Sequence, residues 1–173
     1  MMNATPLPTK AALVATLAAA SAAIASFVAT RSDPVEPGDA APYLCLLSGL
    51  FLLRVGGQVL VRVRTPRWLP PTEEWNLSPY QLLLPAQLAI LGLMAWVDAD
   101  FARGSGFWTE PHPALGRAVL WFTLVYAAAM LMRYVVRMSR RPDQRWFGGT
   151  IPIFFHWVLA GYLVVFGSFH ASH

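Results

Sequence analysis

The chain has 173 residues, of which 56% are hydrophobic and 13% charged, with a mean hydropathy of +0.48 and a net charge of +4. Soluble domains carry about 25% charged residues, so this composition excludes an ordinary water-soluble domain and indicates a single membrane domain over residues 1–173. The positive charge does not indicate nucleic-acid binding, because the basic residues flank apolar runs and form no separate basic face.

The first apolar run covers about residues 11–30 and is rich in alanine. Small residues at a spacing of four allow helices to pack closely in lipid. They form two adjacent stripes: Ala15, Ala19 and Ala23, and Ala18, Ala22 and Ser26. A cleaved signal peptide is the alternative, but its apolar region is normally about 7–15 residues behind a basic start. Here the run is longer and only Lys10 precedes it, which favours a retained helix.

Four more apolar runs follow, each close to the roughly 20 residues that a helix needs to cross a bilayer. They cover about residues 42–61, 79–97, 114–136 and 151–169. Pro79 after Ser78, and Pro152 soon after Thr150, fit helix starts, where an N-cap hydroxyl and a first-turn proline are favoured. The predicted fold class is therefore all-α: a polytopic integral membrane protein with a single bundle of five transmembrane helices.

The loops between these runs differ in charge. Residues 62–77 and 137–149 are rich in arginine, whereas 31–41 and 98–113 are net acidic. The positive-inside rule places the arginine-rich loops and the N-terminus in the cytoplasm and the C-terminus outside, with a bacterial inner membrane as the expected location. Five tryptophans fall at predicted span ends, as in an interfacial belt: Trp68, Trp75, Trp96, Trp108 and Trp146.

Polar residues gather in the cytoplasmic half of the predicted spans. Polar groups in hydrocarbon need partners, so we expect them to face one another or a ligand. The predicted ligand-binding residues are Arg54, Gln58, Gln87, Tyr126, Arg133 and His156. Gly56 and Gly57 leave room for a helix or a ligand beside them.

Arg54 has two interpretations. Its guanidinium extends to the cytoplasmic headgroups or helix carbonyls while the stem packs on apolar neighbours, or it binds an anionic or carbonyl-bearing group such as a lipid phosphate, a quinone or a haem propionate. Arg133 lies near the end of its run, where a topological role is the simpler interpretation.

His156 also has alternatives: a hydrogen bond to a neighbouring helix, through Gln87 or Tyr126, a haem or metal ligand, or a contact to a proton or quinone. Its spacing of fourteen residues from His170 is similar to that of the paired ligands in four-helix cytochromes b. Those proteins carry matching histidines on a second helix, and here His112 and His173 are predicted to lie outside the membrane. Haem b therefore needs a ligand from another subunit, a symmetry mate or a methionine.

The outer side carries a loose acidic and histidine group: Asp98, Asp100, Glu110, His112, His170 and His173. Its spacing is not that of a metal site, so we expect no metal and a solvated loop. The single cysteine, Cys45, excludes a disulfide within one chain and is expected to be a buried, inert thiol.

Together these features predict a small integral membrane protein with a polar pocket in the cytoplasmic leaflet that binds a lipid, a quinone or a similar amphiphile. It is expected to be non-catalytic and to act as an accessory subunit beside a membrane-protein partner, or as a homo-oligomer. The alternatives are a membrane oxidoreductase or haem-binding subunit using His156, and a small transporter. The apolar outer half disfavours the transporter, which needs a polar path to both sides.

Overall fold

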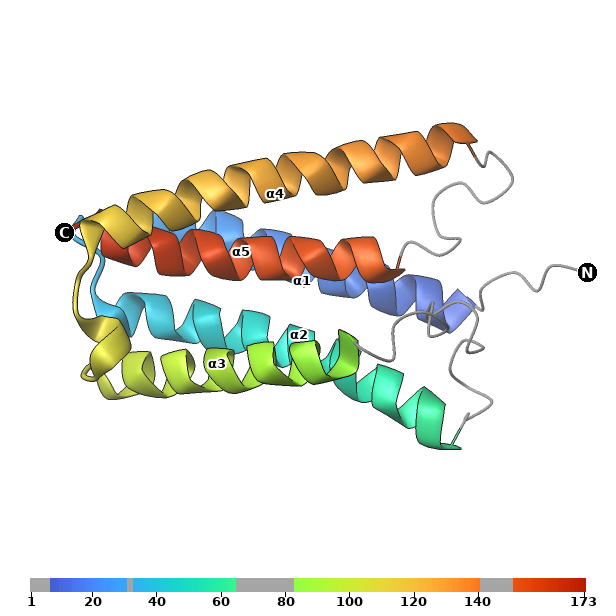
Figure 1. Ribbon diagram of the computed structural model, residues 1–173, viewed down its shortest axis with the longest axis horizontal. Coiled ribbons are helices and arrows are strands. Elements are labelled where there is room, and N and C mark those ends of the chain that lie inside the picture. Colours follow the sequence, from blue (N-terminus) through green and yellow to red (C-terminus); the bar gives the residue numbers. More distant parts are fainter. Residues whose placement is uncertain (1–6, 31–32, 65–82, 141–150) are drawn as a thin grey trace, which may run out of the picture.

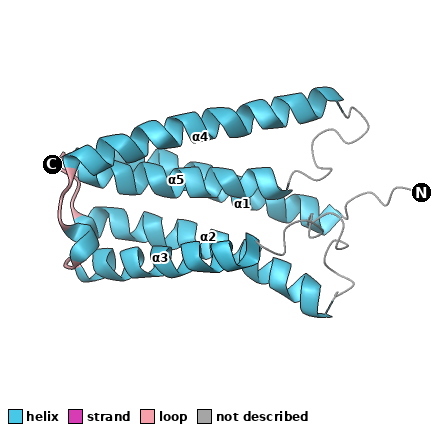
Figure 2. Ribbon diagram, viewed as in Figure 1, coloured by secondary structure: helices cyan, strands magenta, loops and turns pink. Residues whose placement is uncertain are grey.

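The computed structural model describes residues 7–30, 33–64, 83–140 and 151–173. In these ranges the protein is helical and has no strand (Figure 2), which confirms the predicted all-α class. The elements are α1 (Leu7–Thr30), α2 (Pro37–Arg64), α3 (Leu83–Arg103), the short 3-10 helix η3 (Phe107–Thr109), α4 (Pro113–Arg140) and α5 (Ile151–Ala171).

The five long helices lie lengthwise in one bundle, with the start of α1 and the end of α5 at opposite ends (Figure 1). The C-terminal end of the bundle holds the α1–α2 connection and η3, and the N-terminal end is where α1 begins and α4 ends. α5 is the central helix and packs against α4, α2 and α1, while α3 packs on α2 and η3. α3 and α4 make no extensive contact with each other, so a gap between them lies over α5.

Three of the helices are long and apolar enough to cross a membrane: α2 over Pro37–Leu60, α3 over Leu84–Arg103 and α4 over its whole length. α5 is the most buried of the helices, because it packs against α1, α2 and α4. Val158 and Val165 are fully buried in it, and Phe169 is 1% exposed. A helix that is apolar all round is expected at the centre of a bundle.

Glycines set the closest approaches of α5. A Cβ on Gly116 of α4 would lie 2.3 Å from the backbone nitrogen of Ala171, so this crossing requires glycine. A Cβ on Gly161 would lie 2.6 Å from the side chain of Ile24 in α1. The face of α1 that packs here differs from the predicted alanine stripes: Ala20, Ala23 and Phe27 are buried.

Of the stripe residues other than Ala23, Ala19 is half-buried and Ala15, Ala18, Ala22 and Ser26 are exposed. The stripes were predicted from spacing alone, whereas the packing face is set by Phe27, whose ring meets Tyr43 of α2 edge-on at 5.3 Å.

The largest differences from the predicted boundaries are at the start of α2 and the end of α3. α2 begins at Pro37, five residues before the predicted start, and contains Pro42. Val35, two residues before α2, is 1% exposed, and its N–H donates to Ser172 Oγ at 3.1 Å. Part of the predicted acidic loop therefore belongs to the protein core. α3 continues through Asp98 and Asp100 to Arg103. The predicted Ser78–Pro79 and Thr150 helix starts lie outside the described residues, as do Trp68, Trp75 and Trp146.

Cys45 is exposed on α2, so the expectation of a buried thiol was wrong. It lies on the side of α2 that faces away from the core residues Leu44 and Leu47, which are fully buried. An apolar environment for this thiol would come from lipid and not from the protein core.

Candidate functional site

Arg54 and Gln58 form a buried polar pair on α2. Residues four apart share one face of a helix, and here Arg54 Nη1 donates to Gln58 Oε1 at 2.5 Å. The two side chains are 7% and 4% exposed. The guanidinium carbon of Arg54 also lies 5.4 Å from the ring centroid of Phe155 on α5, which is a cation–π distance. A charged group is therefore held between two apolar helices.

His156 and Tyr126 form a second polar pair between α5 and α4. The Tyr126 hydroxyl and His156 Nδ1 share a hydrogen bond, and the two rings meet edge-on with centroids 5.6 Å apart. Phe122, one turn before Tyr126, stacks on the tyrosine ring at 5.7 Å. The predicted hydrogen bond of His156 to a neighbouring helix is thus confirmed, with Tyr126 as the partner.

α5 brings the two pairs to the same level of the bundle. Phe155 and His156 are consecutive, and consecutive helix side chains diverge by about 100°, so Phe155 contacts Arg54 of α2 while His156 contacts Tyr126 of α4. Arg54 and His156 are close enough to interact electrostatically. We call Arg54, Gln58, Phe155, His156 and Tyr126 the Arg54 cluster.

The other two predicted residues are less closely associated. Arg133 is exposed on α4, although its charge also acts on His156. Gln87 is half-buried on α3, and its Oε1 is buried with no hydrogen-bond partner in the part of the chain that the structure describes. The contacts described do not join Gln87 to Arg54. The ligand-binding role of all six residues remains a prediction.

Among the residues that the structure describes, no carboxylate forms an ion pair with Arg54. Within residues 7–30, 33–64, 83–140 and 151–173, the ion pair found is Arg103–Asp100, at the other end of the bundle. Guanidinium has five N–H donors, and the hydrogen bond described for Arg54 uses one of them. The Arg54 cluster therefore has positive charge and donor capacity to offer an anion or a carbonyl.

An apolar groove of about 390 Å³ lies between α2 and α3, close to this cluster. Val55 and Gly56 line its α2 wall and Leu88 and Leu91 its α3 wall. A Cβ on Gly56 would meet nothing within 4 Å, so the glycine leaves open space, as the sequence suggested. None of the six predicted residues lines this groove.

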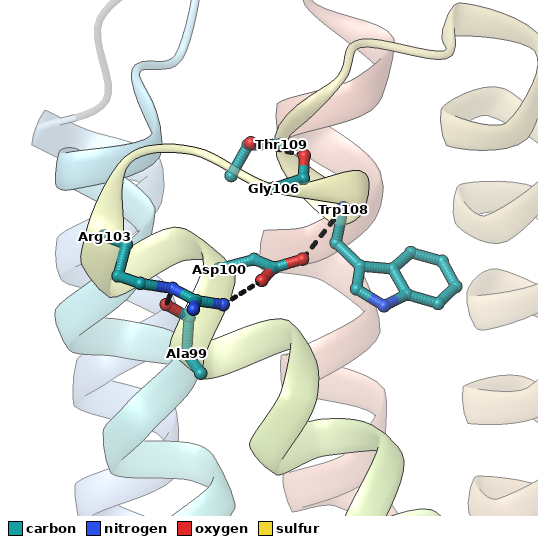
Figure 3. Close-up of polar contacts among 6 residues, drawn as sticks. All are labelled: Ala99, Asp100, Arg103, Gly106, Trp108 and Thr109. Atoms are coloured by element: carbon teal, nitrogen blue, oxygen red, sulfur yellow. Dashed lines mark hydrogen bonds and ion pairs between the residues drawn. The ribbon is translucent and has the colours of Figure 1, made fainter.

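The opposite end of the bundle holds a polar structure that the sequence reasoning missed. Asp100, 2% exposed, accepts a hydrogen bond from the Trp108 N–H at 3.2 Å and pairs with Arg103 at 2.5 Å (Figure 3). Two residues earlier on α3, Asp98 accepts from the Tyr162 hydroxyl of α5 at 3.2 Å. The signal was available, since Met94, Val97 and Phe101 repeat at helical spacing and are all buried.

The expected solvated loop was therefore wrong at two positions, Asp100 and His170. His170 is 1% exposed, its Nδ1 accepts the His112 N–H at 3.3 Å, and its ring packs on Phe166 at 4.5 Å. No cluster of three His, Cys, Asp or Glu side chains able to hold a metal occurs among the residues described. His170 is buried where α5 packs closely against Gly116 of α4, and Asp100 is buried where η3 packs against the end of α3.

No family model, no curated protein and no solved structure matches this chain.

Proposed function

We propose that this chain is a five-span integral membrane protein that holds an amphiphile at the Arg54 cluster. Beyond the three long apolar helices, α1 has 24 residues and α5 has 21, which meets the length of about 20 that a crossing needs. The start of α1 and the end of α5 lie at opposite ends of the bundle, which supports an odd number of crossings (Figure 1). α4 exposes large apolar side chains along its length, including Trp121 at 68% and Leu124 at 60%, as a lipid-facing helix would.

The proposed orientation has the N-terminal end of the bundle in the cytoplasm of a bacterial inner membrane. Arg137 and Arg140 lie in the last turns of α4, at this end. The C-terminal end carries the acidic residues Asp98, Asp100 and Glu110. This asymmetry follows the positive-inside rule and puts the Arg54 cluster in the cytoplasmic half.

The amphiphile is one whose head group carries a phosphate or a carbonyl, as in a phospholipid or a quinone. The single observation that carries this proposal is that Arg54 is 7% exposed without a carboxylate partner in the described chain. A charge in an apolar environment is costly unless it is paired. An anionic or carbonyl oxygen on the free N–H groups supplies that partner, and the apolar groove beside Gly56 accommodates its tail.

Mass spectrometry of amphiphiles that co-purify with the protein in mild detergent tests this. Wild-type protein is expected to retain one phosphate- or carbonyl-bearing amphiphile, and Arg54→Leu to lose it while still inserting in the membrane. Arg140→Leu, an exposed arginine at the end of α4, is the matched control and should retain it. Equal retention by Arg54→Leu and wild type would refute the binding role.

A second candidate function is a haem-binding subunit that uses His156. The observation in its favour is that Tyr126 engages Nδ1, which leaves Nε2 as the ring nitrogen for a ligand bond; metal-binding histidines are commonly oriented through their other nitrogen. Reduced-minus-oxidised visible spectra of the purified protein test this. Sharp haem bands lost in His156→Ala would establish it, and a featureless spectrum would exclude it for the isolated chain.

The proposed role is accessory and non-catalytic, with a membrane-protein partner or a second copy on the exposed face of α4. α4 packs on α5, and most of its surface is apolar and exposed. The transporter alternative receives less support, because a layer of buried apolar residues, Leu47, Phe51 and Val158, separates the Arg54 cluster from Asp98 and Tyr162.

A further inference from the structure

Three arginines gather on one face of α4 near its C-terminus. Arg133 and Arg137 are one turn apart and Arg140 follows after another turn, so the three lie within about 60° of the helix circumference. Arg133 and Arg140 are exposed, and no carboxylate among the described residues forms an ion pair with either of them. α4 contains no Asp or Glu over its 28 residues. We call these three arginines the basic end of α4.

The basic end extends past the start of α5 at the N-terminal end of the bundle (Figure 1). The two helices are antiparallel and approach most closely where Gly116 meets the backbone of Ala171. α5 has 21 residues and begins at Ile151, and a stretch of equal length that starts at Gly116 of α4 ends at Val136. Because the rise per residue is the same, Arg140 lies beyond the level at which α5 begins. α5 therefore does not cover the last turn of α4.

An exposed apolar row leads from the basic end toward the middle of the bundle. Arg140, Val136, Met132 and Ala128 are spaced four apart, so they are neighbours along one side of α4. Val136 is 41% exposed and Met132 is 68% exposed, and Ala128 is exposed as well. The row rises about 18 Å, close to half of the roughly 30 Å hydrocarbon core. A molecule that fits it has an anionic head group and hydrocarbon of about one leaflet in length.

We propose that the basic end of α4 binds an anionic phospholipid of the cytoplasmic leaflet. Its phosphate lies on Arg133 and Arg140, and one acyl chain follows Val136 and Met132. Guanidinium groups suit phosphate oxygens in geometry and charge, and basic residues beside a membrane span attract the anionic lipids of the cytoplasmic leaflet. This surface site is separate from the buried Arg54, and the proposal rests on the membrane placement and orientation proposed above.

Charge favours a lipid over a second copy of this chain at the basic end. Two copies inserted in the same orientation would bring their arginines into the same layer of the membrane, where like charges repel. A phosphate instead offsets the positive charge. A partner protein or a second copy, as proposed above, would therefore contact α4 farther from this end, around the exposed Trp121.

Photolabelling in nanodiscs tests the head-group preference. The full-length protein is reconstituted in phosphatidylcholine with a small fraction of either phosphatidylglycerol or phosphatidylcholine that carries a diazirine at the same acyl position. Mass spectrometry then compares labelling at Met132 with labelling at Leu53, which is 72% exposed on α2 and serves as the reference for surrounding lipid. In wild type this ratio should be several-fold higher with phosphatidylglycerol. Equal ratios with the two lipids overturn the proposal.

Substitutions of the exposed arginines link that preference to charge. Each basic residue near an anionic surface strengthens binding about fivefold, so Arg133→Gln combined with Arg140→Gln should remove the preference. Arg133→Lys with Arg140→Lys keeps the charge and should retain most of it. Arg117→Gln, at an exposed position near the other end of α4, is the control and should leave it unchanged. An unchanged preference in the double glutamine variant contradicts the proposal, as does a wild-type dimer without label at Met132.

The outcomes separate this proposal from the proposed function. Absence of label at both Met132 and Leu53 would refute the membrane placement and with it both proposals. Label at both positions without a head-group preference would refute the surface site alone, because the amphiphile at Arg54 is measured separately by its loss in Arg54→Leu. A lipid on the exposed surface of α4 is expected to exchange with detergent, so it does not enter that measurement.

Topology reporters identify a variant whose insertion has changed. A fusion after residue 142 should remain cytoplasmic in each arginine variant. If the double glutamine variant inserts differently, Arg140→Gln alone replaces it, since Arg133 and Arg137 then remain, and the head-group preference should fall about fivefold. An undiminished preference in this single variant would equally overturn the proposal.

Discussion

The guanidinium of Arg54 lies over the ring of Phe155, with 5.4 Å between Cζ and the ring centroid. The contact joins α2 to the central helix α5, and it is made one residue away from His156, which binds Tyr126 of α4. Three helices therefore meet at one level of an otherwise apolar bundle: α2 meets α5 through a cation–π contact, and α5 meets α4 through a hydrogen bond.

Replacing Phe155 with leucine should destabilise the protein through this contact. Leucine keeps an apolar side chain but removes the π face beside the guanidinium, a contact worth about 0.5–2 kcal/mol where it is desolvated. The free energy of unfolding in detergent measures the loss. Phe122→Leu, at a ring that is 59% exposed, is the control and should change it less. Equal effects of the two substitutions would mean that neither the cation–π contact nor the burial of Phe155 stabilises the protein.

Tyr126→Phe isolates the second pair. It removes the hydroxyl that bonds His156 Nδ1 and leaves the ring, so the expected loss of stability is about 0.5–1.5 kcal/mol, the net value of one hydrogen bond. Tyr134→Phe on the same helix, where the structure describes no hydrogen bond for the hydroxyl, should change stability by less. A chemical shift change of the His156 ring on Tyr126→Phe, absent in Tyr134→Phe, gives an independent readout. An unchanged chemical shift of the His156 ring in Tyr126→Phe would argue against the Tyr126–His156 hydrogen bond.

Gly116→Ala should disrupt the α4–α5 crossing. The new Cβ would lie 2.3 Å from the Ala171 backbone nitrogen, and backbone cannot give way as a flexible side chain can, so we expect a loss of about 1–3 kcal/mol. Gly56→Ala places the same methyl where nothing lies within 4 Å and should be tolerated or stabilising. The comparison of the two unfolding free energies checks the helix packing. A tolerated Gly116→Ala would show that α4 and α5 do not approach as closely as described.

Asp100→Ala should cost more than Arg103→Ala. Asp100 is buried and holds the Trp108 N–H as well as Arg103, so its loss leaves a donor without an acceptor and costs about 1–3 kcal/mol. The Arg103 side chain is 64% exposed, and an exposed ion pair contributes about 1 kcal/mol or less. Unfolding free energies and amide hydrogen exchange at Trp108 measure both effects. The reverse order would mean that the ion pair, not the hydrogen bond, fixes the turn.

Much of the fold could be predicted, because an apolar run of about 20 residues by itself indicates a helix long enough to cross a bilayer. α5 begins at the predicted residue and ends two residues beyond the predicted end. The end of α3 could not be placed in the same way. Asp98 and Asp100 indicate solvent by composition, but Tyr162 and the Trp108 N–H, which satisfy their oxygens, come from other elements.

The site shows the same division. Gln58 follows Arg54 at helical spacing, and Tyr126 was one of two partners expected for His156. The Arg54–Gln58 and Tyr126–His156 pairs can therefore be predicted from the sequence. The contact of Arg54 with Phe155 and the burial of His170 are not, because they depend on which faces of α2, α4 and α5 meet. The packing of the whole bundle determines which helix faces meet.

The measurement that tests the central claim most directly is the membrane topology of α5. Reporter fusions after residue 142 and after His173 should lie on opposite sides. A fluorescent protein should be active at the first position, in the cytoplasm, and alkaline phosphatase at the second, outside. Both fusions reporting the same side would show that α5 does not cross the bilayer and would contradict the five-span account.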